Sequence, residues 1–377
     1  MRILLIHNQL WAHYKSKLFS EINLALKESH PESAFLVVHI ALHESSRREM
    51  KADDTYFPYD YPYKVLFKRS VDQVKFMERC IALFKAFHAF NPTILNVTGY
   101  FDWAQILLMT YARLRGVKVV LSSESSVMDR DRSAMKELIK KWILSRPHVF
   151  FCFGKSSAHY LLKLGIPRSR ITVRHAAVID EEIIRNNFLE AKKRVQKSIN
   201  NFVYVGRLAP EKNLEMLISA FLKVNNNRKP GSEPWGLILV GEGPSRANLE
   251  RMAASDPSIL FAGGHPWYKV PDWLALSDVL VLPSKSEPWG LVVNEAMVCG
   301  LPVIVSNKCG CVRDIVKDGE NGFTFQPKSV MELERALNYF VENPDKISEM
   351  GEKSKMIIEP FAAKQVAIEM IDCYKTL

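Results

Sequence analysis

Short apolar runs alternate with amphipathic stretches along the whole chain. In the first half, apolar runs predict strands at residues 2–7, 34–41, 93–98, 118–123, 148–153 and 171–174. A period of 3.6 residues predicts helices between them, at residues 14–29, 71–90, 102–115, 133–146 and 156–164. Nearly continuous apolar strands that alternate with helices are typical of a parallel sheet covered on both faces. The first half is therefore predicted to be a doubly wound α/β domain.

The same pattern begins again after a polar, charged stretch at residues 180–201. Further strands are predicted at residues 201–205, 235–240, 259–262, 279–283 and 301–306, and helices at residues 214–224, 245–254 and 292–298. We expect two doubly wound domains, at residues 1–180 and 198–358, and a helix within residues 359–377 that packs back on the first domain. Open α/β sheets bind ligands beyond the carboxyl ends of their strands. Two such domains that face a central cleft would suit the joining of a donor and an acceptor.

Composition excludes several classes of protein. The chain has 377 residues, of which 47% are hydrophobic and 24% are charged, so disorder, collagen and a disulfide-stapled miniprotein are excluded. No run of about 18 apolar residues occurs, so no membrane span is expected. The six cysteines form no CxxC pair, and we interpret them as incidental thiols of a reducing compartment. The N-terminal apolar run is interpreted as a buried strand and not as a signal peptide, so we expect a cytoplasmic location.

The positive charge is concentrated in the first half. The formal net charge is +10; residues 1–180 hold 27 Lys and Arg against 16 Asp and Glu, and residues 181–377 hold 24 against 25. This asymmetry favours an anionic partner for the first half. Nucleic acid, anionic lipid and a phosphorylated substrate are all candidates, and an ordinary solvated basic surface is the alternative.

The first candidate site is the segment VGRLAPEKN, at residues 205–213. It leaves a predicted strand, turns at Gly206 and opens a helix, and it carries Arg207 and Lys212. A planar guanidinium and a compact ammonium near a helix N-terminus are suited to hold the oxygens of a diphosphate. The segment matches neither a Walker A loop nor GxGxxG. The alternative is a solvated turn with surface charges.

The second candidate site is PSKSEPWGLVVNEA, at residues 283–296. Glu287 lies in a loop and Glu295 in the following helix. Pro288 and Gly290 interrupt the regular structure between them, which would let the two carboxylates converge. The backbone N–H groups of Gly290, Leu291 and Val292 lie near a helix N-terminus and could hold a phosphate or sugar oxygen. Glu295 is suited to accept both hydroxyls of a ribose. The alternative for Glu295 is compensation of the helix dipole.

Four further segments of the second half accompany these two: VGEGP at residues 240–244, FAGG at 261–264, CGLPVIVS at 299–306 and DGENG at 318–322. All six segments, in their order along the chain, resemble the motifs of a known family. The second half resembles the donor-binding domain of the family-4 glycosyltransferases, closely over about residues 200–325. The first half is similar only in architecture, apart from LGIP at residues 164–167. The resemblance implies the GT-B fold, an α/β fold of two Rossmann-like, doubly wound domains that face a central cleft.

The resemblance also implies roles. Arg207 and Lys212 would hold the diphosphate of a nucleotide sugar and stabilise the departing phosphate, Glu287 would contact the donor sugar, and Glu295 would bind the ribose. Further donor-binding positions would be Gly206, Gly241, Gly264, His265, Gly290, Leu291 and Val292. Enzymes of this family retain anomeric configuration and need no metal ion, so neither a metal nor another cofactor is expected.

The first half departs from the family pattern. The first strand is followed by HNQLWAHY, at residues 7–14, where many relatives have a Gly-Gly turn. Glu124 stands where many relatives have a histidine near the reacting sugar. We therefore give Asn8, His13 and Glu124 only as candidates for acceptor or sugar contact.

Residues 135–146 form a basic amphipathic segment. Its apolar residues are Leu138, Ile139, Trp142 and Ile143, and Lys136, Lys140 and Lys141 accompany them. Such a segment can lie on an anionic membrane surface. The alternative is a helix whose apolar stripe packs into the core and whose basic face is solvated.

The sequence thus predicts a retaining, metal-independent glycosyltransferase. It would move a sugar from a UDP- or GDP-sugar to a hydroxyl of a glycan or lipid-linked acceptor, in surface polysaccharide biosynthesis, with peripheral contact to the inner face of an anionic membrane. One alternative is another nucleotide-sugar enzyme of the same fold, a phosphorylase or an epimerase. A non-catalytic nucleotide-binding or nucleic-acid-binding protein is the other. No nucleic-acid partner is expected, because neither an aromatic β platform nor a basic repeat occurs.

Overall fold

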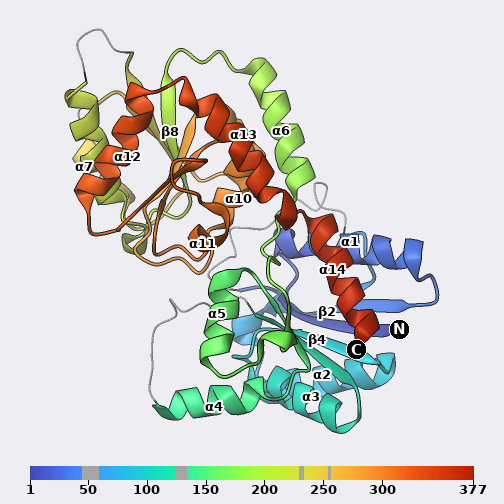
Figure 1. The fold of residues 1–377 in the computed structure, drawn as a ribbon. Helices are drawn as coiled ribbons and strands as arrows, with labels where there is room; N and C mark the ends of the chain where they lie inside the picture. Colours follow the sequence, from blue (N-terminus) through green and yellow to red (C-terminus); the bar gives the residue numbers. More distant parts are fainter. Residues whose placement is uncertain (45–58, 124–133, 229–232, 254–255) are drawn as a thin grey trace. The chain divides into compact units, whose positions relative to one another are not determined.

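The computed structural model describes residues 1–44, 59–123, 134–228, 233–253 and 256–377. The chain divides into two compact units. Unit 1 comprises Met1–Asp180 and Pro360–Leu377, and unit 2 comprises Glu181–Glu359. Each unit is a parallel β-sheet with helices on both faces (Figure 1). The α/β class predicted from the sequence is confirmed.

The sheet of unit 1 has the strand order β3-β2-β1-β4-β5-β6-β7. Its strands are β1 (Arg2–Gln9), β2 (Ala34–His43), β3 (Tyr63–Ser70), β4 (Ile94–Thr98), β5 (Lys118–Ser123), β6 (Val149–Cys152) and β7 (Ile171–Val173). The sequence pattern predicted all of these except β3. Because β3 lies at the edge of the sheet and most of its residues are exposed or only half-buried, it lacks the continuous apolar run of a central strand.

Helices α1 (His13–Ser29) and α14 (Ala363–Thr376) cover one face of this sheet (Figure 1). Helices α2 (Phe76–Phe90) and α3 (Trp103–Leu114) cover the other, where α4 (Ala134–Leu144) and α5 (Lys155–Lys163) follow in the chain. A short 3₁₀ turn, Val71–Gln73, precedes α2, so the helix predicted from residue 71 begins later. Helix α14 packs against α1, and the buried Asn96 Nδ2 of β4 donates a 2.7 Å hydrogen bond to the hydroxyl of buried Tyr374.

The sheet of unit 2 has the order β10-β9-β8-β11-β12-β13. Its strands are β8 (Asn200–Val205), β9 (Trp235–Val240), β10 (Ile259–Gly263), β11 (Val279–Leu282), β12 (Val303–Ser306) and β13 (Gly322–Phe325). Helices α7 (Leu214–Asn226), α8 (Arg246–Ala253) and α12 (Val330–Glu342) gather on one side. On the other side lie α6 (Glu181–Arg194), α9 (Val270–Ala275), α10 (Leu291–Val298), the short α11 (Val312–Ile315) and α13 (Lys346–Ile358).

Helix α6 corrects the interpretation of residues 180–201 as a polar stretch between the domains. Residues 181–194 form a regular helix that packs on α9 within unit 2. Most residues of this helix are charged or polar, but three residues at helical spacing are buried: Ile184, Phe188 and Ala191. An apolar stripe of this width is enough to bury one face of a helix.

The hydrogen bond between α14 and β4 gives a test of how unit 1 is held together. Replacing Tyr374 with Phe leaves the buried Asn96 amide N–H without its acceptor, which should destabilise unit 1 by about 1–3 kcal/mol. In native-state hydrogen exchange, protection should fall in β4 and α14 and stay unchanged in β8 and β11. The exposed neighbour Lys375→Ala serves as the control. Unchanged protection in β4 would contradict this assignment.

Candidate functional site

The turns that follow β8, β9 and β10 lie against one another at the carboxyl edge of the unit 2 sheet. The Gly206 N–H donates to the Val240 carbonyl at 2.9 Å, and the Gly241 N–H donates to the Gly263 carbonyl at 2.8 Å. Gly241 has a φ of +145°, and a Cβ there would collide with the carbonyl oxygen of Gly206. Only glycine fits where two backbones approach so closely. The predicted positions Gly206 and Gly241 are therefore neighbours on one surface.

Lys212 and Glu287 form an ion pair between the turn after β8 and the loop after β11. The Lys212 Nζ donates to the Glu287 Oε2, and each side chain is only 17% exposed. A backbone bond joins the same two segments, from the Lys285 N–H to the Glu211 carbonyl at 2.8 Å. Two candidate segments that are 75 residues apart in the sequence thus meet, and their charged side chains contact each other.

A third loop supports Glu287. Its N–H donates to the Lys308 carbonyl at 3.2 Å, and its carbonyl accepts from the Gly310 N–H at 3.0 Å. Residues 308–310 follow β12, so Glu287 is fixed between the ends of two adjacent strands. The buried Cys309 lies in the same bridge. Burial raises the pKa of its thiol, so this cysteine stays protonated and serves as packing.

Arg207 pairs with Glu211, which the sequence analysis did not single out. The Arg207 guanidinium donates to the Glu211 carboxylate, and the arginine side chain is 63% exposed. The pKa of Glu211 is lowered, first by a hydrogen bond from its own backbone N–H and further by Arg207. The signal was present in the sequence, because the two residues stand four positions apart around the 3₁₀ turn Pro210–Lys212. Each predicted cation therefore faces a carboxylate.

Glu295 lies in α10, whose N-cap is Gly290 with a φ of +97°. A Cβ on Gly290 would approach the Leu282 side chain to 2.7 Å, so the tight turn requires glycine. Leu291 and Val292 are the first helical residues, and their N–H groups belong to the unpaired end of the helix. Burial raises the pKa of Glu295 to about 7. A carboxyl group that titrates near neutrality within a candidate site is typical of a functional position.

Trp289 fixes the loop on which Glu287 stands and was not predicted. Its indole Nε1 donates to the Asn294 Oδ1 at 2.9 Å, and both side chains are buried. This bond ties the loop before α10 to the helix itself, so it sets the direction in which α10 begins.

Gly264 and His265 follow β10, beside the other turns of this edge. Gly264 lies against the Glu242 side chain, and the His265 Nε2 is 3.0 Å from the Ala262 carbonyl. The imidazole is exposed, and its centroid is 5.1 Å from the ring of Trp273. The exposed imidazole, with the half-buried Trp273 ring beside it, could contact a nucleotide base.

The candidates in unit 1 are less well defined. Asn8 lies in β1 and its Oδ1 accepts a 2.7 Å hydrogen bond from the Gln105 Nε2 of α3. His13 is the first residue of α1. Glu124 lies outside the described residues. A buried polar cluster that no sequence motif predicted lies in the same unit: the His39 Nε2 is 3.2 Å from the Tyr61 hydroxyl, which donates to Ser16 at 3.1 Å. Burial, and then His7, lower the pKa of His39, so this imidazole is neutral.

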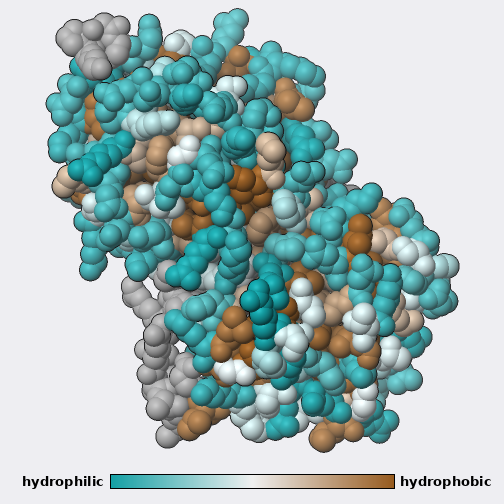
Figure 2. Space-filling view, in the orientation of Figure 1, coloured by the Kyte–Doolittle hydropathy of each residue, from teal (hydrophilic) through white to brown (hydrophobic). Residues whose placement is uncertain are grey.

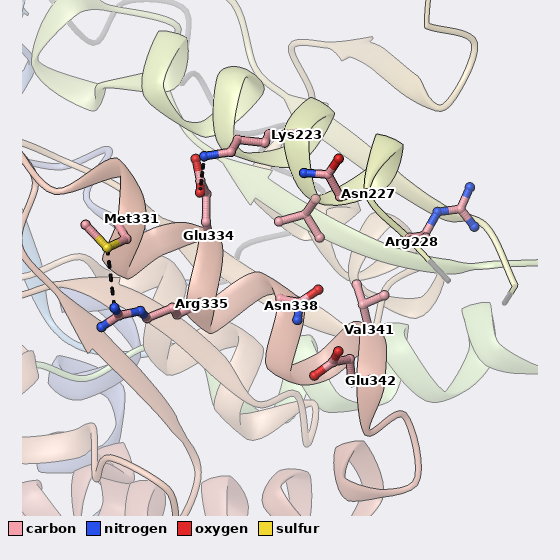
Figure 3. Close-up of a pocket in the computed structure, with 10 residues that line it drawn as sticks. Lys223, Asn227, Arg228, Met331, Glu334, Arg335, Asn338, Val341 and Glu342 are labelled. Atoms are coloured by element: carbon pink, nitrogen blue, oxygen red, sulfur yellow. Dashed lines mark hydrogen bonds and ion pairs between the residues drawn. The ribbon is translucent and has the colours of Figure 1, made fainter. Parts of the chain in front are cut away.

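A groove between α7 and α12 is separate from this site (Figure 3). Its volume is about 490 Å³, and Lys223, Arg228, Glu334 and Arg335 are among its lining residues. The Lys223 Nζ is bonded to the Glu334 carboxylate at 2.7 Å. Lys223 stands nine residues after Leu214 along α7, which places it about 14 Å from the end that follows Lys212. The groove is therefore separate from the candidate site at the carboxyl edge of the unit 2 sheet.

Within the described residues, no group of three His, Cys, Asp or Glu side chains is arranged to hold a metal ion. In the same part of the chain, no helix is long and apolar enough to cross a membrane.

Sequence comparison assigns a family to the second half. Residues 186–356 match the family model of the glycosyl transferases group 1. The sulfoquinovosyl transferase SQD2 of Arabidopsis thaliana is 29% identical over 191 residues, which are 48% of this chain and 36% of the relative. A D-inositol 3-phosphate glycosyltransferase of Rhodococcus erythropolis is 30% identical over 181 residues, 46% of this chain and 40% of the relative. The chain therefore spans well under half the length of these two relatives.

Solved structures resemble the chain over its full length. HepE of Anabaena in complex with UDP has a TM-score of 0.75 at 17% identity, and the galactosyltransferase WaaB of the lipopolysaccharide outer core has 0.72 at 17% identity; the match covers 100% of both chains in each case. At this level of identity the likeness establishes the fold. The second unit is thus a group 1 glycosyl transferase domain, and the chain as a whole has the GT-B fold.

Proposed function

We propose that the chain is a glycosyltransferase that moves a sugar from a nucleoside-diphosphate sugar to a hydroxyl acceptor. The observation that carries this proposal is the contact between Lys212 and Glu287 at the carboxyl edge of the unit 2 sheet. Ligands of open α/β sheets bind at this edge. The match of residues 186–356 to the group 1 glycosyl transferases supports it.

The arrangement suits a negatively charged leaving group. Lys212 would stabilise the charge that develops on the departing diphosphate, and the exposed Arg207 would contact the same group from the other end of its turn. Preorganised cations aimed at developing charge are usually the largest contribution to catalysis. Glu287 keeps the Lys212 ammonium in place and would contact the donor sugar.

Glu295 and the start of α10 would hold the rest of the donor. The carboxyl group of Glu295 would accept hydrogen bonds from the ribose hydroxyls. The N–H groups of Leu291 and Val292 would meet the diphosphate or the sugar, since a helix N-terminus attracts anions. We propose UDP before GDP as the nucleotide, because HepE, a neighbour in fold, binds UDP.

The finer features rest on the resemblance to family-4 glycosyltransferases. We propose that transfer retains the anomeric configuration and needs no divalent metal. The acceptor would be a glycan or a lipid-linked glycan of surface polysaccharide assembly, and the enzyme would act in the cytoplasm at the inner face of the membrane.

A nucleotide screen tests the donor site. UDP should raise the melting temperature of the chain more than GDP or ADP, and EDTA should leave the shift unchanged. A ligand at a hundred times its Kd stabilises the folded state by about 2.7 kcal/mol. The absence of a shift with every nucleotide would exclude the proposed function. Release of sugar 1-phosphate in the presence of inorganic phosphate, or of an altered sugar, from a UDP-sugar, with no glycoside product, would instead favour a phosphorylase or epimerase.

Replacement of Lys212 tests its role in catalysis. Lys212→Met should lower kcat by about 10²–10³-fold, which is the usual effect of removing one stabilising donor. The matched control is Lys223→Met, which removes another lysine of unit 2 that is paired with a glutamate but lies in the groove of Figure 3. Its kcat should stay within about two-fold of the original. Equal effects of the two substitutions would refute the assignment.

The pKa of Glu295 predicts a pH dependence of donor binding. In the free chain this carboxyl group is protonated below about pH 7, and a neutral carboxyl accepts hydrogen bonds less well than a carboxylate. The affinity for a UDP-sugar, measured by calorimetry, should therefore fall as the pH decreases from 8 to 6. In Glu295→Gln it should be weaker throughout and should not vary over this range. A parallel pH dependence in both proteins would assign the titration to another group.

A further inference from the structure

Helix α4 presents apolar side chains to solvent. Leu138, Ile139 and Trp142 are 67%, 42% and 46% exposed, whereas Ile143 and Leu144 are buried. Of the four apolar residues that the sequence analysis placed on this stripe, only Ile143 packs inward. The alternative in which the whole stripe packs into the core is therefore wrong. An exposed stripe of large apolar residues indicates an interaction surface.

Helix α3 also presents apolar side chains to solvent. Trp103, Leu107 and Leu114 are 52%, 46% and 82% exposed, and intervals of four and seven residues place them on one side of the helix. A 2.6 Å hydrogen bond from the Arg113 guanidinium to the Arg146 carbonyl brings the C-terminal ends of α3 and α4 together. Figure 2 shows hydrophobic atoms at the solvent surface in the region where Figure 1 places these helices. We call the six residues the apolar face: Trp103, Leu107, Leu114, Leu138, Ile139 and Trp142.

Several cations near the apolar face pair with no carboxylate among the described residues. We call them the basic rim: Arg113, Lys118, Lys141, Arg146 and Arg170. Within the described part of the chain, none of the five lies within ion-pair distance of an Asp or Glu. The Arg146 guanidinium lies 4.5 Å from the centroid of the Trp142 ring, so the rim and the apolar face are in contact.

The sequence helps to explain why none of the described carboxylates pairs with the rim. Residues 138–179 contain eight Lys and Arg and not one Asp or Glu. The positive surplus of the first half is therefore concentrated on the segment that includes most of α4. The cations also repel one another: the pKa of Arg170 is lowered by burial and by Arg113. Unbalanced charge of this kind is stabilised by an anionic partner.

We propose that the apolar face and the basic rim are a docking surface for an anionic lipid bilayer. Trp142, Leu138 and Ile139 would enter the boundary between headgroups and acyl chains, and the rim would contact lipid phosphates. This surface belongs to unit 1 and contains none of the donor-site residues. The inference therefore stands or falls separately from the proposed transfer of a sugar.

Two other partners fit the surface less well. A second copy of the chain would bring two cationic rims together, and like charges across an interface are costly. A nucleic acid would satisfy the rim but would leave leucine and isoleucine side chains without an apolar partner. A bilayer provides phosphate and hydrocarbon within a few ångströms of each other, as this combination requires.

Vesicle sedimentation tests the proposal. The chain should bind phosphatidylcholine vesicles that contain about 30% phosphatidylglycerol, bind pure phosphatidylcholine much more weakly, and lose affinity as salt is added. Replacing both Lys118 and Lys141 with Gln should reduce partitioning about five-fold per lysine. The double variant Leu138→Ser with Trp142→Ser should reduce it about ten-fold or more. The matched control is Met252→Ser with Met356→Ser, which removes two exposed apolar residues of unit 2 and should not change binding.

Several outcomes would overturn this docking surface. They are an absence of binding to anionic vesicles, equal binding to neutral and anionic vesicles, and unchanged binding of the Leu138/Trp142 variant. A dimer in light scattering that the same substitutions dissociate, with vesicle binding unaffected, would assign the face to self-association. The UDP-induced thermal shift of every variant is measured in parallel. Loss of vesicle binding with an intact thermal shift supports the docking surface, and loss of the thermal shift alone concerns only the donor site.

Discussion

The ion pair between Lys212 and Glu287 is the interaction on which the candidate site depends. It joins the turn after β8 to the loop after β11, and both side chains are largely shielded from water. A pair in such surroundings is strengthened by the lower local dielectric, and removal of one partner leaves an uncompensated charge. The position of each charge is therefore determined by the other, and the neighbouring bonds of Lys285 and Gly310 keep both loops in place.

The parallel sheet makes this contact available. In unit 2, β8, β9, β10, β11 and β12 end at one edge, and the segments that follow them supply glycine turns, cations and carboxylates. Where two backbones meet, as at Gly206 and Gly241, glycine removes the side chain that would separate them. Where a helix begins, at Gly290, it permits the turn from which α10 starts at the same edge. The chemistry of the site thus follows from the topology of the sheet and from a few positions where a Cβ does not fit.

Unit 1 combines a conventional sheet with an unusual surface. Its core is completed by α14, which joins β4 through Tyr374 and Asn96. On the opposite face of the sheet, α3 and α4 leave large apolar side chains in water next to cations that have no carboxylate partner among the described residues. The charge asymmetry of the chain is therefore a property of unit 1 and is unrelated to Arg207 and Lys212, which lie in the nearly neutral half. This separation allows the partner of unit 1 and the ligand of unit 2 to be studied independently.

The sequence by itself determined the class of fold, most of the strands, and the residues of unit 2 that form the candidate site. Buried parallel strands are nearly continuous apolar runs, and the turns that bind ligands require glycine and charged residues at fixed spacing. Both features can therefore be predicted from the sequence. Edge strand β3 was missed because its apolar run is short and flanked by charged residues, and helix α6 because its few apolar positions are separated by charged residues. Strand β13 and helices α9, α12 and α13 were not predicted either. Only the tertiary structure decided which charges pair, that Trp289 fixes the Glu287 loop, and that the stripe on α4 faces water. Each of these depends on contacts between segments far apart in the chain, or on the side of a helix that the sheet leaves uncovered, and local periodicity is the same in either case.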